Sequence, residues 1–218
     1  KEVTEGFLYD RPFEAREANF TEPLLPEPAD YNQVLLDILS HENMASREPI
    51  FEQYDKQVQG RIHTETGLVD SGVMAPFNSE KYPEEIRNVG IALSTDHNPR
   101  YGQIDPYWGG INAVVESMRN VAAVGATPHA LSDCLCFGNP EKPHQMWEFV
   151  ESVRGVADAC RSITLKDNPD HATPIIAGNV SFYNESKSGA IPPSPIVSCL
   201  GKLKDVNKTV PAHFQKGD

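Results

Sequence analysis

Acidic, amide and glycine residues recur where three predicted strands of this 218-residue chain run out. Asp96 and Asn98 follow one apolar run, Asp133 lies in a second, and Gly178 and Asn179 follow a third. Carboxylate and amide oxygens suit Mg2+, which keeps several waters and shares its remaining positions with substrate phosphates. Glycines let a phosphate approach the backbone amides closely. The pattern predicts a magnesium and nucleotide site, and it is not a P-loop, because GxxxxGK[ST] does not occur in the sequence.

The same residue types also have a purely structural interpretation. Asp and Asn after a strand often bond their own backbone and simply shape the turn. The histidines at 97, 129 and 144 have no spacing typical of metal ligands, so we interpret them as ordinary surface or core residues. The polar residues at the strand ends can therefore be interpreted either as a ligand site or as turn residues, and both interpretations stay open.

Four cysteines lie at positions 134, 136, 160 and 199, without the density of a disulfide scaffold. Cys134 and Cys136 have no second pair at zinc-site spacing and no evident cationic neighbour that would activate a thiol. Alternation along a strand places these two thiols on one face and Asp133 and Leu135 on the other. We interpret the cysteines as structural thiols.

Composition excludes several classes of function. The chain has 39% hydrophobic residues and a net charge of -12, with no stripe of Lys and Arg that would attract a nucleic-acid backbone. No apolar run approaches the roughly 20 residues of a bilayer span, and no secretory signal is present. We expect a cytoplasmic protein that binds neither membrane nor nucleic acid. The chain starts at Lys1, so we expect a processed product or a piece of a longer protein.

Strands that alternate with amphipathic helices position the candidate site. Apolar residues at i, i+3 and i+4 predict one helix from Gly109 to Gly125 and a longer one over residues 147–163. Continuous apolar runs predict strands over residues 89–94, 129–137, 174–177 and 195–200. This order predicts an α/β (α+β) fold in which helices pack on a sheet. The polar residues 164–173 are expected to form a surface insertion.

The N-terminal part of the chain has a different character. Residues 1–30 are acidic and rich in proline, which predicts an extended arm without a core of its own. Residues 31–88 contain a helical pattern after the N-cap Asp30, a second short helix over 47–54 and a short strand near 73–75. We interpret 31–88 as the helical and irregular end of a preceding domain, and 89–218 as the α/β domain.

Several ordered motifs resemble the phosphoribosylformylglycinamidine synthase family, and specifically the second half of its ATP-using synthetase subunit. The resemblance is dense over residues 89–205 and extends more loosely back through residues 45–47 and 53–59. It rests on Ser94–Tyr101, Asp105–Gly110, Arg119–Ala122, Ser132–Leu135, Phe137–Pro143 and Gly178–Glu185. It implies a domain of the aminoimidazole-ribonucleotide-synthetase N-terminal type, with a mixed sheet and packed helices, preceded by an acidic linker.

The resemblance also implies an activity. The family is an ATP- and Mg2+-dependent carbon–nitrogen ligase, an amidoligase of purine biosynthesis. It converts formylglycinamide ribonucleotide and glutamine-derived ammonia to formylglycinamidine ribonucleotide. By motif, Asp133 and Gly178 resemble ATP-binding residues, Asn179 a magnesium ligand and Ser181 a contact to the substrate. The family's catalytic histidine belongs to the first half of the subunit, so we assign no catalytic residue here and expect the isolated chain to be inactive.

The partners implied by the resemblance are the first half of the synthetase subunit, a glutaminase subunit or domain, and a small ribonucleotide. A homodimer is also expected, because such domains pair with their twin through sheet edges into a shared barrel. Two alternatives stay open: a non-catalytic nucleotide-binding half of the enzyme, or a related ATP-dependent member of the superfamily. The run from Gly178 to Glu185 argues against the second.

Three features depart from the family pattern. His97 stands where the family usually has Gly, which puts the conformation of that turn in question. Cys136 replaces the usual Asn and removes a polar side chain beside the expected site. Residues 166–172 are extra length between the two main motifs, and we expect them at the surface.

Overall fold

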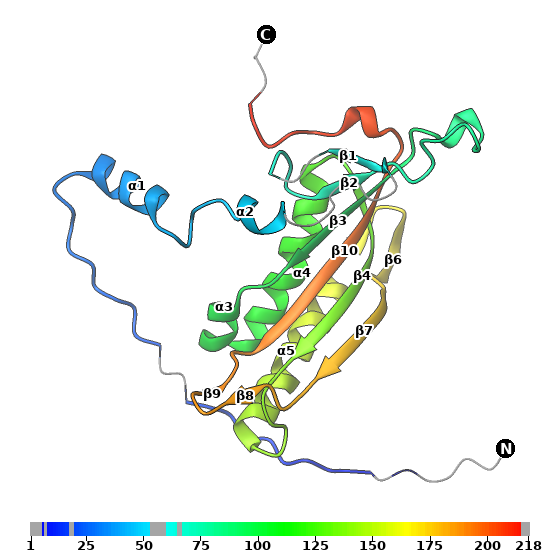
Figure 1. The fold of residues 1–218 in the computed structure, drawn as a ribbon. Coiled ribbons are helices and arrows are strands. Elements are labelled where there is room, and N and C mark those ends of the chain that lie inside the picture. Colours follow the sequence, from blue (N-terminus) through cyan, green and yellow to red (C-terminus); the bar gives the residue numbers. More distant parts are fainter. Residues whose placement is uncertain (1–5, 7, 18–19, 53–59, 65–66, 215–218) are drawn as a thin grey trace.

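A six-stranded mixed sheet forms the centre of the molecule (Figure 1). The computed structural model describes residues 6, 8–17, 20–52, 60–64 and 67–214. The sheet has the order β1-β2-β3-β10-β4-β7, in which β10 runs antiparallel to both neighbours and β7 runs parallel to β4. Its strands are β1 (Ile62–Thr64), β2 (Gly72–Met74), β3 (Gly90–Asp96), β4 (Thr127–Cys136), β7 (Ile175–Ser181) and β10 (Ser194–Leu203). Because β3, β4 and β7 share one direction, their C-terminal ends meet at one end of the sheet.

Two long helices, α4 (Pro106–Ala123) and α5 (Pro143–Ser162), cover one face of the sheet (Figure 1). Their apolar stripes are buried with the sheet residues of that face, as the helical spacing predicts. A short helix, α3 (Pro99–Ile104), precedes α4 and was not predicted. The two long helices touch closely: a Cβ at Gly155 would lie 2.0 Å from the carbonyl oxygen of Tyr107. Only glycine permits this approach.

The third long strand differs from its prediction. We expected it to cover residues 174–177 and to end before Gly178, but β7 continues to Ser181. Parallel pairing with β4 extends to its last residue, where Ser181 lies opposite Cys136. The expectation that Gly178 and Asn179 follow this strand was therefore wrong, because tertiary pairing overrides the local turn signal of these two residues.

Small elements surround the sheet. The polar segment 164–173 forms a hairpin in which residues 166–172 are exposed, so their predicted surface position is confirmed. A second hairpin follows the end of β7. These elements are β5 (Thr164–Leu165), β6 (Asn168–Ala172), β8 (Glu185–Ser186), β9 (Gly189–Ala190) and the 3-10 turns η2 (Glu84–Ile86) and η3 (Val206–Lys208).

The segment before the sheet lies largely outside the core. Helix α1 (Tyr31–Ser40) begins at its predicted N-cap Asp30 and buries none of its residues. Helix α2 (Glu48–Phe51) is shorter than the predicted helix over 47–54. The end of that prediction and the motif similarity over residues 53–59 lie outside the described residues. Strands β1 and β2 also come from this segment and join the sheet, which therefore begins before residue 89.

Part of the N-terminal arm contacts the domain. The amide of Glu14 donates to the carbonyl oxygen of Pro143 at 3.2 Å, and Arg16 Nε lies 3.1 Å from a carboxylate oxygen of Glu148. These contacts place the arm along the start of α5. In the described part of the chain, every helix is too short or too polar to cross a bilayer.

Candidate functional site at the edge of the sheet

One row of residues runs across four strands of the sheet. Val197 on β10 lies opposite Asp96 on β3 and Asp133 on β4, and Asp133 lies opposite Gly178 on β7. Residues opposite one another in a sheet point to the same face. Val197 is only 1% exposed and belongs to the core under the helices, so the two aspartates and Gly178 face the helices as well.

Asp133 and Gly178 are in direct contact. A Cβ added at Gly178 would lie 2.2 Å from Oδ1 of Asp133, so the carboxylate occupies the space that the missing side chain leaves free. Asp133 is partly buried, and this burial raises the pKa of its carboxyl above the usual range. Its negative charge in turn raises the pKa of the Cys160 thiol on α5, after the larger effect of burial. The structure therefore joins the two expected ATP-binding residues.

Asn179 and Ser181 lie on the opposite face of the same strand. Asn179 pairs with Cys134 and Ser181 pairs with Cys136, each one residue away from the positions that face the helices. Ser181 Oγ donates to Oδ1 of Asn184 at 3.3 Å. The four expected site residues are thus neighbours along the edge strand β7 and its partner, but they divide between the two faces of the sheet.

The predicted alternation of the cysteines is confirmed. The Sγ atoms of Cys134 and Cys136 are 3.6 Å apart on the face that carries Asn179 and Ser181. Burial raises the pKa of the Cys136 thiol, and its hydrogen bond with Cys134 adds to this effect. All four cysteines are free thiols, and Cys160 and Cys199 are buried.

The remaining polar residues at the strand ends serve local structure. Asn98 caps α3 and accepts from the amide of Arg100 at 3.0 Å, and Asn139 accepts from the amide of Glu141 at 2.9 Å. Asp96 accepts from Asn120 Nδ2 at 2.9 Å and from the hydroxyl of Ser94. These two asparagines therefore bond their own backbone, as the structural interpretation describes.

The neighbouring His97 occupies the position where the family pattern has Gly. Its side chain is partly buried, and this burial lowers its pKa. Its backbone does not adopt the positive φ that would demand glycine, since Tyr183 is the one non-glycine residue with positive φ among the described residues. The turn therefore tolerates His97 without strain.

Two residues near the site were missed by the residue-by-residue reasoning. Asn184 Nδ2 donates to the carbonyl oxygens of Phe137 at 3.0 Å and Ser181 at 2.8 Å, which ties the end of β4 to the end of β7. Tyr183 has a φ of 60°, an uncommon conformation for a residue with a side chain. The signal available in the sequence was their place in the Gly178–Glu185 motif.

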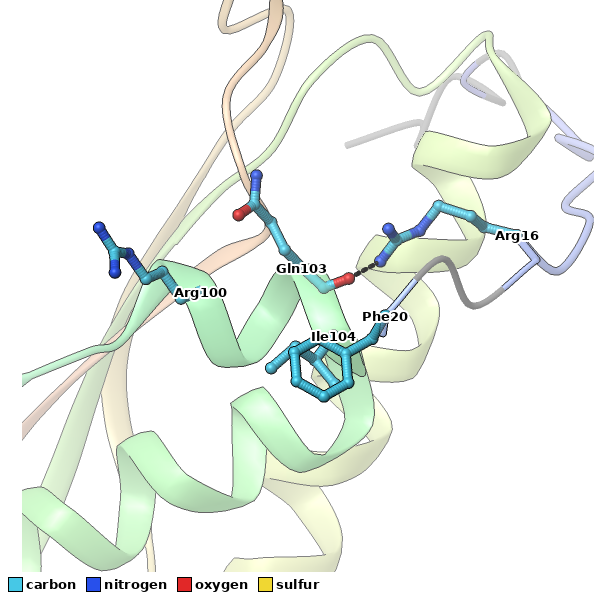
Figure 2. A pocket seen from close by; sticks show the side chains of 5 residues that line it. All are labelled: Arg16, Phe20, Arg100, Gln103 and Ile104. Carbon is cyan, nitrogen blue, oxygen red and sulfur yellow. Dashed lines mark hydrogen bonds between the residues drawn. The ribbon is translucent and has the colours of Figure 1, made fainter. Parts of the chain in front are cut away.

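A pocket of about 410 Å3 lies between the arm and α3, away from this edge (Figure 2). In Figure 2 Phe20 lies over Ile104, and the guanidinium of Arg16 donates to the carbonyl oxygen of Gln103. The side chain of Arg100 points away from Arg16. None of the expected site residues lines this pocket. We interpret the pocket as part of the contact between the arm and the domain.

The donor groups at the edge of β7 suit a magnesium ion that is bound mainly through substrate and water. Asn179 offers an amide oxygen and Ser181 a hydroxyl oxygen, and both belong to the hard ligands that Mg2+ prefers. Over the described residues, His, Cys, Asp and Glu side chains do not gather in groups of three that would hold a metal by themselves. Such a donor set fits Mg2+, which commonly takes its other ligands from phosphates and waters.

Comparison with known proteins gives a consistent result. The model of the family "AIR synthase related protein, N-terminal domain" matches residues 72–203. The synthase subunit PurL ("Phosphoribosylformylglycinamidine synthase subunit PurL") of Methanothrix thermoacetophila is 51% identical over 96% of the chain and 26% of its own length. The protein of the same name from Moorella thermoacetica is 43% identical over 88% of the chain and 24% of its own length. The chain thus spans about a quarter of the length of these relatives.

Solved structures agree with the fold. Thermotoga maritima PurL in complex with ATP has a TM-score of 0.59 and 27% identity, over 76% of the chain and 24% of that protein. The PurLQS assembly from the same organism gives a TM-score of 0.60 at 25% identity, over 90% of the chain and 28% of the matched one. The resemblance drawn from the motifs and the predicted fold class are both confirmed. The chain therefore belongs to the AIR synthase related protein family and contains its N-terminal domain.

Proposed function

We propose that this chain is the second nucleotide-binding part of a phosphoribosylformylglycinamidine synthase, an ATP-dependent carbon–nitrogen ligase. In this reaction ATP activates the amide oxygen of formylglycinamide ribonucleotide as a leaving group, and ammonia from glutamine replaces it. The proposal is supported by the relatives of that name, which match nearly the whole chain at up to 51% identity. It is also supported by the solved PurL complex with ATP that shares the fold.

The contact between Asp133 and Gly178 carries the proposal. β7 is an edge strand, so one side of its backbone has no partner strand in the sheet. Gly178 makes room for the partly buried carboxylate of Asp133 beside this edge, where the carboxylate can accept a hydrogen bond from the nucleotide. In this proposal Asp133 and Gly178 bind ATP from the helix-facing side of the edge.

Asn179 and Ser181 would serve the other side of the same strand. Asn179 would offer its amide oxygen to Mg2+, and the hydroxyl of Ser181 would donate a hydrogen bond to the ribonucleotide substrate. Mg2+ held by Asn179 would have to meet the phosphates around the free edge of β7, because Asp133 and Gly178 face the other side of the sheet, and there it would neutralise their charge. The contribution of the chain itself is to hold these groups in fixed positions along one strand.

A non-catalytic nucleotide site is the second candidate, and one observation favours it. The ATP-binding pair faces the helices, whereas Asn179 and Ser181 face the uncovered side of the sheet. A nucleotide held only by Asp133 and Gly178 would stabilise the fold without reaching the substrate position. The two candidates differ in whether Asn179 takes part in nucleotide binding.

Calorimetric titration with Mg-ADP tests both candidates. We expect Asp133→Ala to weaken binding at least tenfold, because a hydrogen bond to a charged group contributes about 1.5–3 kcal/mol. Asp170→Ala, on the exposed strand β6, is the matched control and should bind as the wild type does. Loss of Mg-ADP binding in Asn179→Ala would support the catalytic candidate, and unchanged binding would support the structural one. Wild-type affinity in Asp133→Ala would contradict both.

The remaining expectations belong to the whole enzyme. We propose that the chain works in the cytoplasm together with the first half of the synthetase subunit and with a glutaminase. Alone it should release no ADP from ATP in the presence of the ribonucleotide and ammonia, because the catalytic histidine of the family belongs to that first half. A coupled assay that shows full ADP release by the 218-residue chain would overturn this part of the proposal.

A further inference from the structure

The turn that follows β7 places one side-chain amide against the hydroxyl that the proposed function assigns to the substrate. Ser181 is the last residue of β7, and Asn184 lies three residues further along the chain. Ser181 Oγ lies 3.1 Å from Nδ2 of Asn184, which donates to it, and 3.3 Å from Oδ1, which accepts from it. Both polar atoms of the Asn184 side chain therefore contact a single hydroxyl group.

Hydrogen bonds to the backbone hold Asn184 in place. Its Nδ2 donates to the carbonyl oxygens of Phe137 at 3.0 Å and of Ser181 at 2.8 Å. Its main-chain amide donates to the same Phe137 oxygen at 3.2 Å, and its carbonyl oxygen accepts from the amide of Ile191 at 3.0 Å. Rotation of the side chain would break the bonds to both carbonyl oxygens, so the amide is oriented before any ligand arrives.

The two residues between Ser181 and Asn184 are fixed as well. The ring of Phe182 contacts Phe149 on α5 edge to face, with 5.0 Å between ring centroids, and Phe149 contacts Phe137 in the same way at 5.3 Å. Tyr183 adopts a φ of 60°, a conformation that costs free energy for a residue with a side chain and is maintained only by its surroundings. The turn is therefore built to hold one conformation.

The Ser181 hydroxyl has a single hydrogen, and the Asn184 amide leaves it two uses. A hydroxyl donates one hydrogen bond, accepts two and rotates to suit its partners. The bond to Oδ1, at 3.3 Å, is longer than the usual O–H···O distance of about 2.5–3.0 Å. An oxygen of a bound ligand can therefore take the hydrogen from Oδ1 at little cost, while Nδ2 continues to hold Oγ from 3.1 Å.

We propose that Asn184 is the positioning residue for the substrate contact of Ser181. Its Oδ1 accepts the hydroxyl hydrogen in the free protein, and its Nδ2 fixes Oγ when that hydrogen turns to an oxygen of the ribonucleotide. The inference rests on the function proposed above, because it takes Ser181 as the substrate contact. The ATP-binding pair Asp133 and Gly178 faces the other side of the sheet, so Asn184 should affect binding of the ribonucleotide and not of the nucleotide.

Steady-state kinetics of the synthetase subunit that carries this chain tests the inference, with ammonium as the nitrogen donor so that no glutaminase is required. Asn184→Ala should raise the KM for formylglycinamide ribonucleotide by about tenfold, the size of one hydrogen bond, and leave the KM for Mg-ATP unchanged. Circular dichroism verifies folding, and Asn184→Ser, which keeps a donor for the carbonyl oxygens, replaces Asn184→Ala if that variant does not fold.

Asn78→Ala is the matched control. Asn78 Nδ2 likewise donates to a backbone carbonyl oxygen, that of Gly60 at 3.0 Å. It lies in the loop after β2, which leaves the sheet at the end where β3 begins, opposite to the end of β7. Both KM values should stay unchanged in this variant.

A double-mutant cycle with Ser181→Ala separates positioning from a general loosening of the turn. Ser181→Ala alone should raise the ribonucleotide KM by about tenfold or more, and adding Asn184→Ala should change it by less than about twofold further, because both substitutions remove the same contact. Multiplied effects in the double variant, an unchanged ribonucleotide KM in Asn184→Ala or a rise in both KM values would overturn the role of Asn184 and leave the proposed function intact. An unchanged KM in Ser181→Ala would instead remove the substrate contact from the proposed function, and the role of Asn184 with it.

Discussion

At the scale of single residues, the partly buried carboxylate of Asp133 lowers the free energy of unfolding, although the residue belongs to the proposed nucleotide site. Its pKa is raised because burial penalises the charged carboxylate. The folded chain therefore binds more protons than the unfolded chain between the usual carboxyl pKa of about 3.9 and the raised value. The free energy of unfolding should consequently fall as pH rises through this window, through the contribution of this group.

We predict that Asp133→Asn removes this contribution. The free energy of unfolding of the variant relative to the wild type should increase as pH rises from the usual carboxyl pKa towards neutrality, because Asn carries no charge to bury. Urea denaturation at a series of pH values measures the difference. Mg-ADP affinity should fall in the same variant, the pattern of a residue kept for function at some cost to stability. A stability difference that does not change with pH would contradict the prediction.

Gly178 provides a second prediction at this scale. Gly178→Ala should lower the free energy of unfolding by about 1–3 kcal/mol, the usual cost of overpacking, because the new methyl group meets the Asp133 carboxylate. In an Asp133→Ala background the same change should cost less than about 1 kcal/mol, since the obstructing carboxylate is gone. Gly72→Ala on β2 is the control, because its methyl group would meet only a carbonyl oxygen at 3.8 Å. Equal costs in the two backgrounds would exclude the contact as the cause.

At the scale of secondary structure, the start of α4 depends on one side chain. Asp105 Oδ1 accepts from the amides of Tyr107 at 2.9 Å and Trp108 at 3.1 Å. We expect Asp105→Ala to lower the free energy of unfolding by about 1 kcal/mol, the typical effect of a lost N-cap. Asp30→Ala removes the cap of α1 in the same way, but α1 buries nothing, so the global unfolding midpoint should stay unchanged. Urea denaturation measures both free energies of unfolding. A larger loss in Asp30→Ala than in Asp105→Ala would contradict the prediction that the cap of α4 matters more for global stability.

The elements also show how far the sequence alone determined the fold. The helices α4 and α5 and the strands β3, β4 and β10 were predictable because each carries its own apolar pattern, as in the stripe of α4. The assignment of β1 to the sheet was not, since its short polar sequence acquires a strand conformation only through pairing with β2. The same holds for α3, whose six residues carry too little periodic pattern.

The candidate site was predictable to a similar degree. Asp133 and Gly178 were expected in one nucleotide site from the resemblance, and the structure brings the two residues into contact. The split between Gly178 and Asn179 was missed, because the strand was expected to end at Ala177. Once β7 is extended to Ser181, the two-residue period of a strand necessarily places Gly178 and Asn179 on opposite faces. The length of the strand, which depends on its pairing with β4, thus decides the geometry of the site.

At the scale of the whole molecule, the two faces of the sheet are unequal. The helices α4 and α5 cover one face, and in the described part of the chain no helix covers the other (Figure 1). The uncovered face carries apolar side chains in neighbouring positions, with Leu93 opposite Leu200 and Met74 opposite Ile91. Leu93 is 51% exposed. An open edge at β7 and an apolar face beside it are the features that a barrel closed with a second sheet would bury.

We therefore predict that the chain on its own, without the proposed first half of the synthetase subunit, self-associates through this face. Light scattering should show a mass that rises with concentration towards twice the monomer. Leu93→Lys should shift the association to at least tenfold higher concentration, because burying a leucine contributes about 1.5–3 kcal/mol and burying a charge is costly. Leu36→Lys is the matched control, since Leu36 is 59% exposed on α1, away from the sheet. A strict monomer at high concentration would show that the uncovered face is not an interface. The same conclusion would follow if Leu93→Lys and Leu36→Lys shifted the association concentration equally.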